Sequence, residues 1–287
     1  MTRFVYHRPR TLDALWEVLE GGPEEVRLLA GGTDLLVAIN KRTLRPASVV
    51  DVKSLEVLRP DIGELDGVLR VGALNVMSDL IVDARVRRHF VALVEAAALV
   101  GSIQIRNRAT LVGNVCNASP AADTAPPLLV YGAFVNLLGP DGERSLSLAE
   151  FFTGPGTTAL GPQEIVTSID LPLPPERHGA AFTRVTRRRG FDLGTVSVAC
   201  LIEPGQQARL AFGAVAARPV LVVDKSGVLG RDGVEAAVEE GALQRLLEAT
   251  SPISDVRASR EYRAAMLISM SRRALAVASE RLQRAGG

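Results

Sequence analysis

The sequence lacks the groups of residues that a metal site requires. Among 287 residues there are two cysteines, Cys116 and Cys200, and three histidines that are far apart along the chain. An iron–sulfur cluster ordinarily needs about four thiolates, and a zinc site about as many nitrogen or sulfur ligands. We therefore expect this chain to carry no metal of its own, and Cys116 to be a small buried thiol that is not reactive.

An excess of one charge and a long apolar segment are also missing. Lys and Arg number 33 against 32 Asp and Glu, for a net charge of +1, so neither nucleic acid nor an anionic membrane is the expected partner. The apolar segment Val91 to Val100 is interrupted by Glu95 and is too short to span a bilayer. Residues 1–10 lack the apolar core of a signal peptide. We expect a cytoplasmic protein without a membrane span.

Several common nucleotide-binding and catalytic motifs are absent as well. No G-x-G-x-x-G follows an expected strand, and there is no P-loop and no G-x-S-x-G, which counts against a Rossmann dinucleotide site. No pair of carboxylates stands out by its spacing as a general acid and base. A hydrophobic content of 47% nevertheless predicts a folded globular protein, long enough for two cores.

What the sequence does contain is two stretches of small residues. In the first, Gly31 and Gly32 follow an expected strand that ends at Ala30, and an apolar run from Leu35 could open a helix with Thr33 as its cap. Two glycines permit positive φ and leave amides uncovered, and the first turn of a helix favours anions. This stretch predicts an anion-binding turn, although the same pattern occurs in ordinary tight turns.

The second stretch runs from Gln104 to Leu129. Small and hydroxyl-bearing residues gather between Thr110 and Pro120, and one carboxylate, Asp123, follows before two prolines. Small side chains let the backbone approach a ligand, exposed amides suit phosphate oxygens, and a single Asp can accept hydrogen bonds from ribose hydroxyls. The stretch is predicted to be a nucleotide cradle. On these residues alone, the alternative is a loop that joins two strands.

Apolar spacing and turn residues divide residues 1–175 into short strands and helices. Thr11 is the expected N-cap of a helix that ends near Gly21 and Gly22, and Ser147 begins a capping-box pattern. One helix is expected after Ser78, with its apolar residues between Val86 and Ala97. Strands are expected at residues 4–8, 26–30, 48–52, 68–74, 133–138 and 164–171.

A cluster of prolines at residues 172–175 interrupts this pattern, because so many prolines sustain neither a strand ladder nor a helix. We place the domain boundary there. Beyond it we expect strands near 180–186, 195–203 and 210–216, a helix at 234–249, and a final helix from Ser259 whose apolar face carries Tyr262, Met266, Met270, Ala274 and Val277. The predicted fold is therefore α+β, ending in a small domain with a three-stranded sheet and helices.

Four motifs carry a resemblance to a known family. AGGTDLL at 30–36, NASPAAD at 117–123, FDLGTVSVA at 191–199 and SREYRAAM at 259–266 together resemble the FAD-binding medium subunit of the molybdenum hydroxylases, the family of xanthine dehydrogenase and carbon monoxide dehydrogenase. The resemblance extends over essentially the whole chain. It implies an FAD-binding domain of the vanillyl-alcohol-oxidase/PCMH type at 1–175, with subdomains of about 1–55 and 56–175, and the C-terminal domain of these flavoproteins at 176–287.

The resemblance also implies which residues bind FAD. The two small-residue stretches would hold the pyrophosphate and ribitol, and the positions after Thr183 would approach the flavin ring. The implied residues are Leu29, Ala30, Gly31, Gly32, Thr33, Asp34, Leu35, Thr110, Gly113, Asn114, Asn117, Ser119, Asp123, Leu160, Arg184, Asp192 and Leu193. Val112 stands where the family usually has glycine, which predicts a change in geometry and not a loss of FAD. Arg187, Arg188 and Arg189 form either a solvated basic run or a cationic patch for reduced flavin or a partner.

The implied function is electron transfer. A large molybdopterin-binding subunit would hydroxylate the substrate, a small 2Fe–2S subunit would carry the electrons, and FAD on this chain would pass them to an external acceptor, in a dimer of heterotrimers. GGTD at 31–34, where the carbon monoxide dehydrogenase branch usually has GGHS, favours a xanthine, N-heterocycle or aldehyde type. The alternatives are a stand-alone flavin oxidoreductase, a carbon monoxide dehydrogenase medium subunit, or a nucleotide-binding scaffold without a redox role. NAD, oxygen and quinone all stay open as acceptors.

Overall fold

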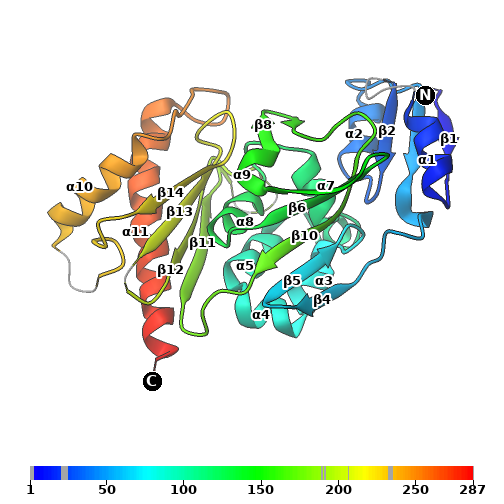
Figure 1. Cartoon of the computed structure of the whole chain (residues 1–287). Helices are drawn as coiled ribbons and strands as arrows, with labels where there is room; N and C mark the ends of the chain where they lie inside the picture. The colour runs from blue at the N-terminus through cyan, green and yellow to red at the C-terminus, as the bar shows by residue number, and fades with distance from the viewer. Residues whose placement is uncertain are drawn as a thin grey trace.

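The computed structural model describes residues 3–20, 25–188, 190, 192–205, 207–231 and 235–286. Over these residues the chain forms three main sheets that follow one another across the molecule in Figure 1, from the N-terminal part on the right to the C-terminal part on the left. Helices fill the space between the sheets, which confirms the α+β class. Most of the expected strands form close to their predicted bounds.

The N-terminal part is a three-stranded parallel sheet in the order β1 (Val5–His7), β3 (Ser48–Asp51), β2 (Val26–Leu29), with α1 (Leu12–Leu19) and α2 (Leu35–Asn40). Thr11 caps α1 by accepting a hydrogen bond from the Ala14 amide, as predicted. The expected end of this helix at Gly21 and Gly22 lies outside the described residues. The prediction that Thr33 caps α2 is wrong, because Asp34 occupies the N-cap position without a side-chain bond.

The middle part is an antiparallel sheet in the order β4 (Ile62–Leu65), β5 (Val68–Gly72), β10 (Ile165–Pro172), β6 (Phe134–Gly139), β7 (Gly142–Ser147). The sequence did not predict the edge strands β4 and β7. Both are short and largely exposed, so they lack the apolar alternation that marks a strand. The capping box at Ser147 is confirmed, and it opens α9 (Leu148–Phe151).

The single helix expected after Ser78 is wrong: three helices occupy this segment, α3 (Met77–Val82), α4 (Ala84–His89) and α5 (Val91–Leu99). The backbone leaves the helical region at Asp83 and again at Phe90. Asp83 starts a new helix because its carboxylate accepts hydrogen bonds from the amides of Arg85 at 2.9 Å and Val86 at 3.2 Å. Apolar spacing continues across both breaks, and this hid them in the sequence.

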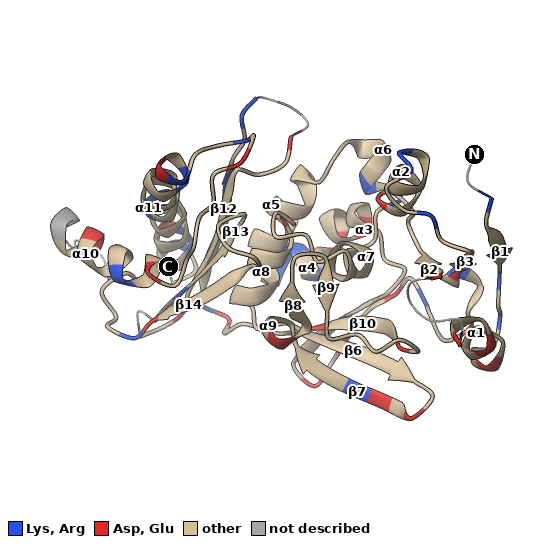
Figure 2. Cartoon of the chain, turned by 90° about the horizontal axis from the view of Figure 1, so that it is seen from above, with Lys and Arg blue, Asp and Glu red and all other residues tan. Residues whose placement is uncertain are grey.

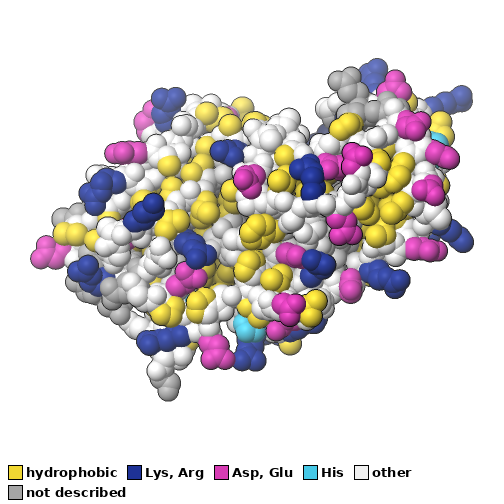
Figure 3. Space-filling view, in the orientation of Figure 1, with side chains coloured by type: hydrophobic (Ala, Val, Ile, Leu, Met, Phe, Trp, Pro, Cys, Tyr) yellow, Lys and Arg dark blue, Asp and Glu magenta, His cyan; other side chains and the backbone are white. Residues whose placement is uncertain are grey.

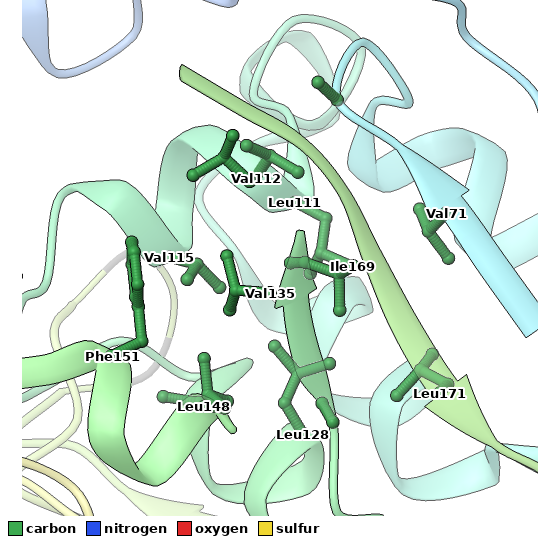
Figure 4. Packing of buried hydrophobic residues seen from close by; sticks show 14 of the residues in the cluster. Val71, Leu111, Val112, Val115, Leu128, Val135, Leu148, Phe151, Ile169 and Leu171 are labelled. Carbon is green, nitrogen blue, oxygen red and sulfur yellow. The ribbon is translucent and has the colours of Figure 1, made fainter. Parts of the chain in front are cut away.

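Short elements connect these parts and build the main core. They are η1 (Val52–Ser54), α6 (Ile103–Arg106), α7 (Leu111–Cys116), α8 (Ala125–Val130), β8 (Phe152–Gly154) and β9 (Thr157–Thr158). Figure 4 shows side chains of α7, among them Val112, packed with residues of β6, α9 and β10. Val112 is 6% exposed in this core. Its side chain therefore faces the interior, which leaves the backbone beside Gly113 uncovered.

The C-terminal part is an antiparallel sheet of β11 (Gly179–Val185), β12 (Val196–Ile202), β13 (Ala208–Gly213) and β14 (Val220–Asp224), with α10 (Ala236–Leu247) and α11 (Arg260–Arg284). The expected three-stranded sheet is thus wrong by one strand, since β14 was missed. The final helix begins after Ser259 as predicted, and Ser259 caps α11 by accepting a hydrogen bond from the Tyr262 amide. Tyr262 was placed on the apolar face of α11 but is 45% exposed, whereas Arg263 is buried beside Leu267 and Met270.

Strand β12 is buried along its whole length because both faces of its sheet are covered. Ala199 and Leu201 belong to the main core with α5 and α8, whereas Val198 and Cys200 pack against α11 in a second core. Across the junction, Glu95 of α5 accepts a hydrogen bond from the Phe182 amide at 2.8 Å and pairs with Arg281 at 2.5 Å. These contacts fix the middle of β11 relative to α5.

The surface seen in Figure 3 carries Lys and Arg interspersed with Asp and Glu, without a field of one sign on that face. Within the described residues, no helix combines the length and the apolar character needed to cross a membrane.

Candidate functional site

A cleft of about 830 Å³ lies where the turn after β2, the end of α5, the segment around α7 and the connection from β11 to β12 meet. Figure 2 shows two of the elements that border it, α2 and α6, next to each other. All but two of the predicted site residues line this cleft. The predicted residues in its lining are Ala30, Gly31, Gly32, Thr33, Asp34, Leu35, Thr110, Gly113, Asn114, Asn117, Ser119, Asp123, Arg184, Asp192 and Leu193.

Leu29 and Leu160 are the two predicted residues outside the cleft lining. Leu29 ends β2 directly before the turn, so it belongs to the strand that positions the glycines. Leu160 is partly buried and packs against the main core. The assignment of these two residues to FAD stays a prediction.

The two small-residue stretches are in direct contact. A Cβ atom added at Gly31 would lie 2.1 Å from the carbonyl oxygen of Arg108 and 3.1 Å from the Cα of Ala109. Only glycine lets the first turn approach the backbone that leads into the second stretch so closely. Gly32 has φ +77°, in the left-handed region that favours glycine. The two glycines therefore have different tasks: Gly31 permits the close approach, and Gly32 permits the turn.

The second stretch begins a helix and is not a simple loop between strands. Thr110 caps α7 by accepting a hydrogen bond from the Gly113 amide at 3.0 Å. The Asn114 side chain accepts a hydrogen bond from the Thr124 hydroxyl at 2.6 Å, which fixes its orientation at the cleft. Because Gly113 has no side chain, its backbone forms part of the cleft wall.

A buried ion pair forms the floor of the cleft beside this helix. Asp123 is 8% exposed, and its Oδ2 accepts a short hydrogen bond from the guanidinium of Arg184. Burial raises the pKa of Asp123 to about 6, against the opposing effect of Arg184. Oδ1 of Asp123 is buried without a hydrogen-bond partner among the described residues. An unsatisfied buried acceptor is costly, so a ligand hydroxyl at this point would stabilise the site.

The arginines after β11 lie at the rim of the cleft. Arg187 pairs with Asp192 at 3.2 Å and Arg188 with the same carboxylate at 3.9 Å, and Arg187 lowers the pKa of Asp192. The Arg188 side chain is 72% exposed although the residue lines the cleft. Arg189 lies outside the described residues. Leu193 presents an apolar side chain at the same rim.

Sequence reasoning missed the apolar part of the wall. These residues come from α2, from the end of α5 and the two residues after it, from α6, and from positions next to predicted residues of the second stretch: Val37, Leu99, Val100, Gly101, Ile105, Ala109, Ala121 and Ala122. Gly101 gave one usable signal, since a glycine directly after an apolar helix often ends it with positive φ, and its φ is +46°. The others are ordinary apolar residues that only the fold brings to the cleft.

Among the described residues, the cleft offers backbone, hydroxyls, the three carboxylates of Asp34, Asp123 and Asp192, a buried arginine and an apolar wall. Asp123 and Asp192 are each paired with arginine. Cys116 is nearby in sequence, but burial of its thiol raises the pKa to about 12, which disfavours the reactive thiolate. This inventory suits a ligand with phosphate, hydroxyl and flat apolar groups, which is the composition of FAD.

Comparison with known proteins agrees with this inventory. The family model for the FAD binding domain in molybdopterin dehydrogenase matches residues 2–174, and that for the CO dehydrogenase flavoprotein C-terminal domain matches residues 180–278. The fold and the cleft thus define an FAD-binding oxidoreductase subunit. The chain belongs to the family of FAD-binding medium subunits of the molybdenum hydroxylases, which confirms the resemblance inferred from its motifs.

Individual relatives cover nearly the whole chain. The xanthine dehydrogenase FAD-binding subunit of Escherichia coli O157:H7 is 34% identical over 98% of this chain and 97% of that protein. The carbon monoxide dehydrogenase medium chain of Afipia carboxidovorans is 31% identical over 97% of both. Among solved structures, carbon monoxide dehydrogenase from Hydrogenophaga pseudoflava matches with a TM-score of 0.89 and 28% identity, covering 97% of this chain and 98% of that chain. Quinoline 2-oxidoreductase from Pseudomonas putida 86 matches with a TM-score of 0.87 and 26% identity over 97% of both.

Proposed function

We propose that this chain binds FAD in the cleft described above, receives electrons from iron–sulfur clusters of a small partner subunit and passes them to an external acceptor. A large molybdopterin-binding partner would carry out the hydroxylation. When bound, FAD supplies a carrier that exchanges both single electrons and electron pairs. The names of the relatives, which are dehydrogenase FAD-binding subunits and medium chains, support this function.

Different residues of the cleft would bind different parts of FAD. The turn at Gly31 and Gly32 would receive the diphosphate through its backbone. The start of α7 would lie beside the diphosphate without an intervening side chain at Gly113, whose amide is already bonded to Thr110. Asp123 would accept a hydrogen bond from a ligand hydroxyl through its unpartnered Oδ1. The remaining predicted residues would complete the enclosure, and the arginines at the rim would favour negative charge on the ligand.

One observation carries this proposal. Gly31 and Arg108 are far apart along the chain, yet the structure brings their backbones into contact at a cleft that is also lined by Asp123, whose buried Oδ1 has no hydrogen-bond partner among the described residues. The unpartnered acceptor supports a ligand-binding role for the cleft, because a ligand hydroxyl there would satisfy it.

The direct test is reconstitution of the purified chain with FAD. We expect one FAD per chain, a shifted flavin spectrum in the visible range, and competition by ADP but not by riboflavin at equal concentration, because the diphosphate dominates the two glycine-bearing contacts. A chain that stays colourless in every preparation would refute the proposal. Turnover of a small substrate without partner subunits would favour a stand-alone flavin oxidoreductase.

We further propose the subtype and the assembly. GGTD at 31–34 and the 34% identity to a xanthine dehydrogenase subunit support a xanthine, N-heterocycle or aldehyde type; a carbon monoxide dehydrogenase medium subunit is the second candidate, favoured by the match to that enzyme's medium chain and structure. Co-expression with the two partner subunits, followed by a substrate screen, separates the two. The expected assembly is a dimer of heterotrimers located in the cytoplasm.

The proposed domain bounds are 1–175, with subdomains of about 1–55 and 56–175, and 176–287. The proline cluster at 172–175 and the limits of the two matched family models, 174 and 180, support the boundary between the two domains. Limited proteolysis tests it, since an exposed linker there would be cut before either core.

A further inference from the structure

Arg263 belongs to the SREYRAAM motif at 259–266, which the proposed binding of FAD leaves without a task. It lies in the first turns of α11, and its side chain is 1% exposed. Arginine is almost never fully buried unless it is paired, because removing its charge from water is expensive. The burial of an arginine in the first turn of α11 therefore requires an explanation.

The guanidinium of Arg263 bridges three segments of the C-terminal part. Nη1 donates hydrogen bonds to the carbonyl oxygens of Thr195 and Ala214, each at 2.6 Å, and Nη2 donates to Oδ1 of Asp255 at 2.7 Å. Asp255 is held in turn by the backbone amides of Arg257 at 2.8 Å and Ala258 at 3.2 Å. The planar guanidinium is therefore fixed, with its charge compensated.

The first of the two carbonyls belongs to the segment that forms the rim of the cleft. Thr195 directly follows Asp192, Leu193 and Gly194 in the chain, and its amide donates a hydrogen bond to the carbonyl of Val185 at 2.8 Å. Val185 is the neighbour of Arg184. The bond from Arg263 to Thr195 thus holds the base of the connection between β11 and β12, from which Arg184, Asp192 and Leu193 reach the cleft.

The second carbonyl leads to the segment that carries Asp123. Ala214 has φ +62°, a strained conformation for a residue other than glycine, and its amide donates a hydrogen bond to the carbonyl of Pro120 at 2.7 Å. Pro120 lies between Ser119 and Asp123, which both line the cleft. One buried side chain is therefore connected, through a single further hydrogen bond on each side, to Val185, the neighbour of Arg184, and to Pro120, three residues before Asp123.

Stability alone does not account for this arrangement. The Nε of Arg263 is buried without a hydrogen-bond partner among the described residues, so the group is incompletely satisfied, and apolar packing often stabilises such a position as well or better. A rigid fork that joins two carbonyls and a carboxylate does what no apolar side chain can do: it fixes the distance between them.

We propose that Arg263 is a positioning residue of the flavin site: it holds the base of the β11–β12 connection against the segment that contains Pro120, and so fixes the geometry in which Arg184 meets Asp123. This inference rests on the proposed function of the cleft. It assigns to the SREYRAAM motif a role in the geometry of a site that the motif itself does not touch.

The test compares Arg263→Lys with Arg209→Lys. A lysine keeps the positive charge near Asp255 but presents a single compact ammonium that cannot bridge all three acceptors. Arg209 is a matched control, because it is partly buried in the same sheet, pairs with Glu203 at 2.9 Å and donates to the carbonyl of Val130 at 3.3 Å, away from the cleft. We expect Arg263→Lys to raise the Kd for FAD by about tenfold or more, the effect of one lost charge-assisted hydrogen bond, and to alter the visible circular dichroism of bound flavin. Arg209→Lys should change neither.

A folded Arg263→Lys protein that binds FAD with the Kd and spectrum of the unmodified chain would overturn the inference. Native-state hydrogen exchange of the unmodified, cofactor-free chain tests it independently of any variant. The amides of Thr195, Ala214 and Arg263 should open with the same free energy, as one cooperative unit. Separate, easier opening of Thr195 would contradict the role of Arg263. Failure of the unmodified chain to bind FAD would refute the proposed function. The exchange result would then still decide whether Arg263 holds the segments of Thr195 and Ala214 together.

Discussion

Replacement of Gly31 by alanine tests the convergence of the two small-residue stretches. The added Cβ would lie 2.1 Å from the carbonyl oxygen of Arg108, whereas real Cβ atoms essentially never come within 3.0 Å of another heavy atom. The Cβ–oxygen distance is therefore about 0.9 Å too short. The oxygen belongs to the backbone, which cannot rotate away as a side chain would. The turn and the segment before α7 must therefore move apart.

The expected cost follows from the size of this displacement. Forcing an additional methyl group into a packed site costs about 1–3 kcal/mol, and if FAD binding requires the two stretches in contact, its Kd should rise about 5- to 150-fold. The cofactor-free chain should also lose about 2–4 °C in Tm for each kcal/mol. Titration of FAD followed by quenching of flavin fluorescence measures the first effect, and thermal unfolding followed by circular dichroism measures the second.

The matched control is Gly63→Ala. Gly63 lies in β4 without positive φ, and an added Cβ there has no heavy atom within 4 Å. This variant should bind FAD like the unmodified chain. If Gly31→Ala also bound FAD with unchanged Kd, the reasoning that both stretches grip one ligand would be refuted.

Two further predictions concern the second stretch. Gly113→Trp should leave the fold intact but prevent FAD from binding, because the indole would extend into the cleft from a position that now lacks a side chain; a variant with normal flavin absorbance would contradict this. The free energy of unfolding of the cofactor-free chain should fall as the pH rises from about 4 to above 6, because Asp123 loses its proton over this range. Its pKa is raised from 3.8 to about 6 in the native state, so the native state binds the proton more tightly, and the stabilisation present below pH 3.8 is lost as the pH passes 6. The loss is at most about 3 kcal/mol, and Asp123→Asn should abolish it, as urea unfolding at several pH values would reveal. Equal pH dependence of both proteins would refute the prediction.

The distinction between the two glycines shows how far local sequence reasoning reaches. The pair at 31–32 predicted a turn with positive φ, and Gly32 has it. The sequence could not indicate that Gly31 is required for a different reason, the approach of Arg108, because that contact joins segments whose separation only the folded chain closes.

The sequence by itself determined the local chemistry: the caps at Thr11 and Ser147, most of the strands, and the motifs that identify the family. These features depend on neighbouring residues, so they can be read along the chain. Only the tertiary structure decided that α3, α4 and α5 are separate helices, that Val112 faces the core, and that Arg263 bonds to the carbonyls of Thr195 and Ala214. Burial and pairing depend on which distant segments meet, and the order of residues within one segment does not encode this.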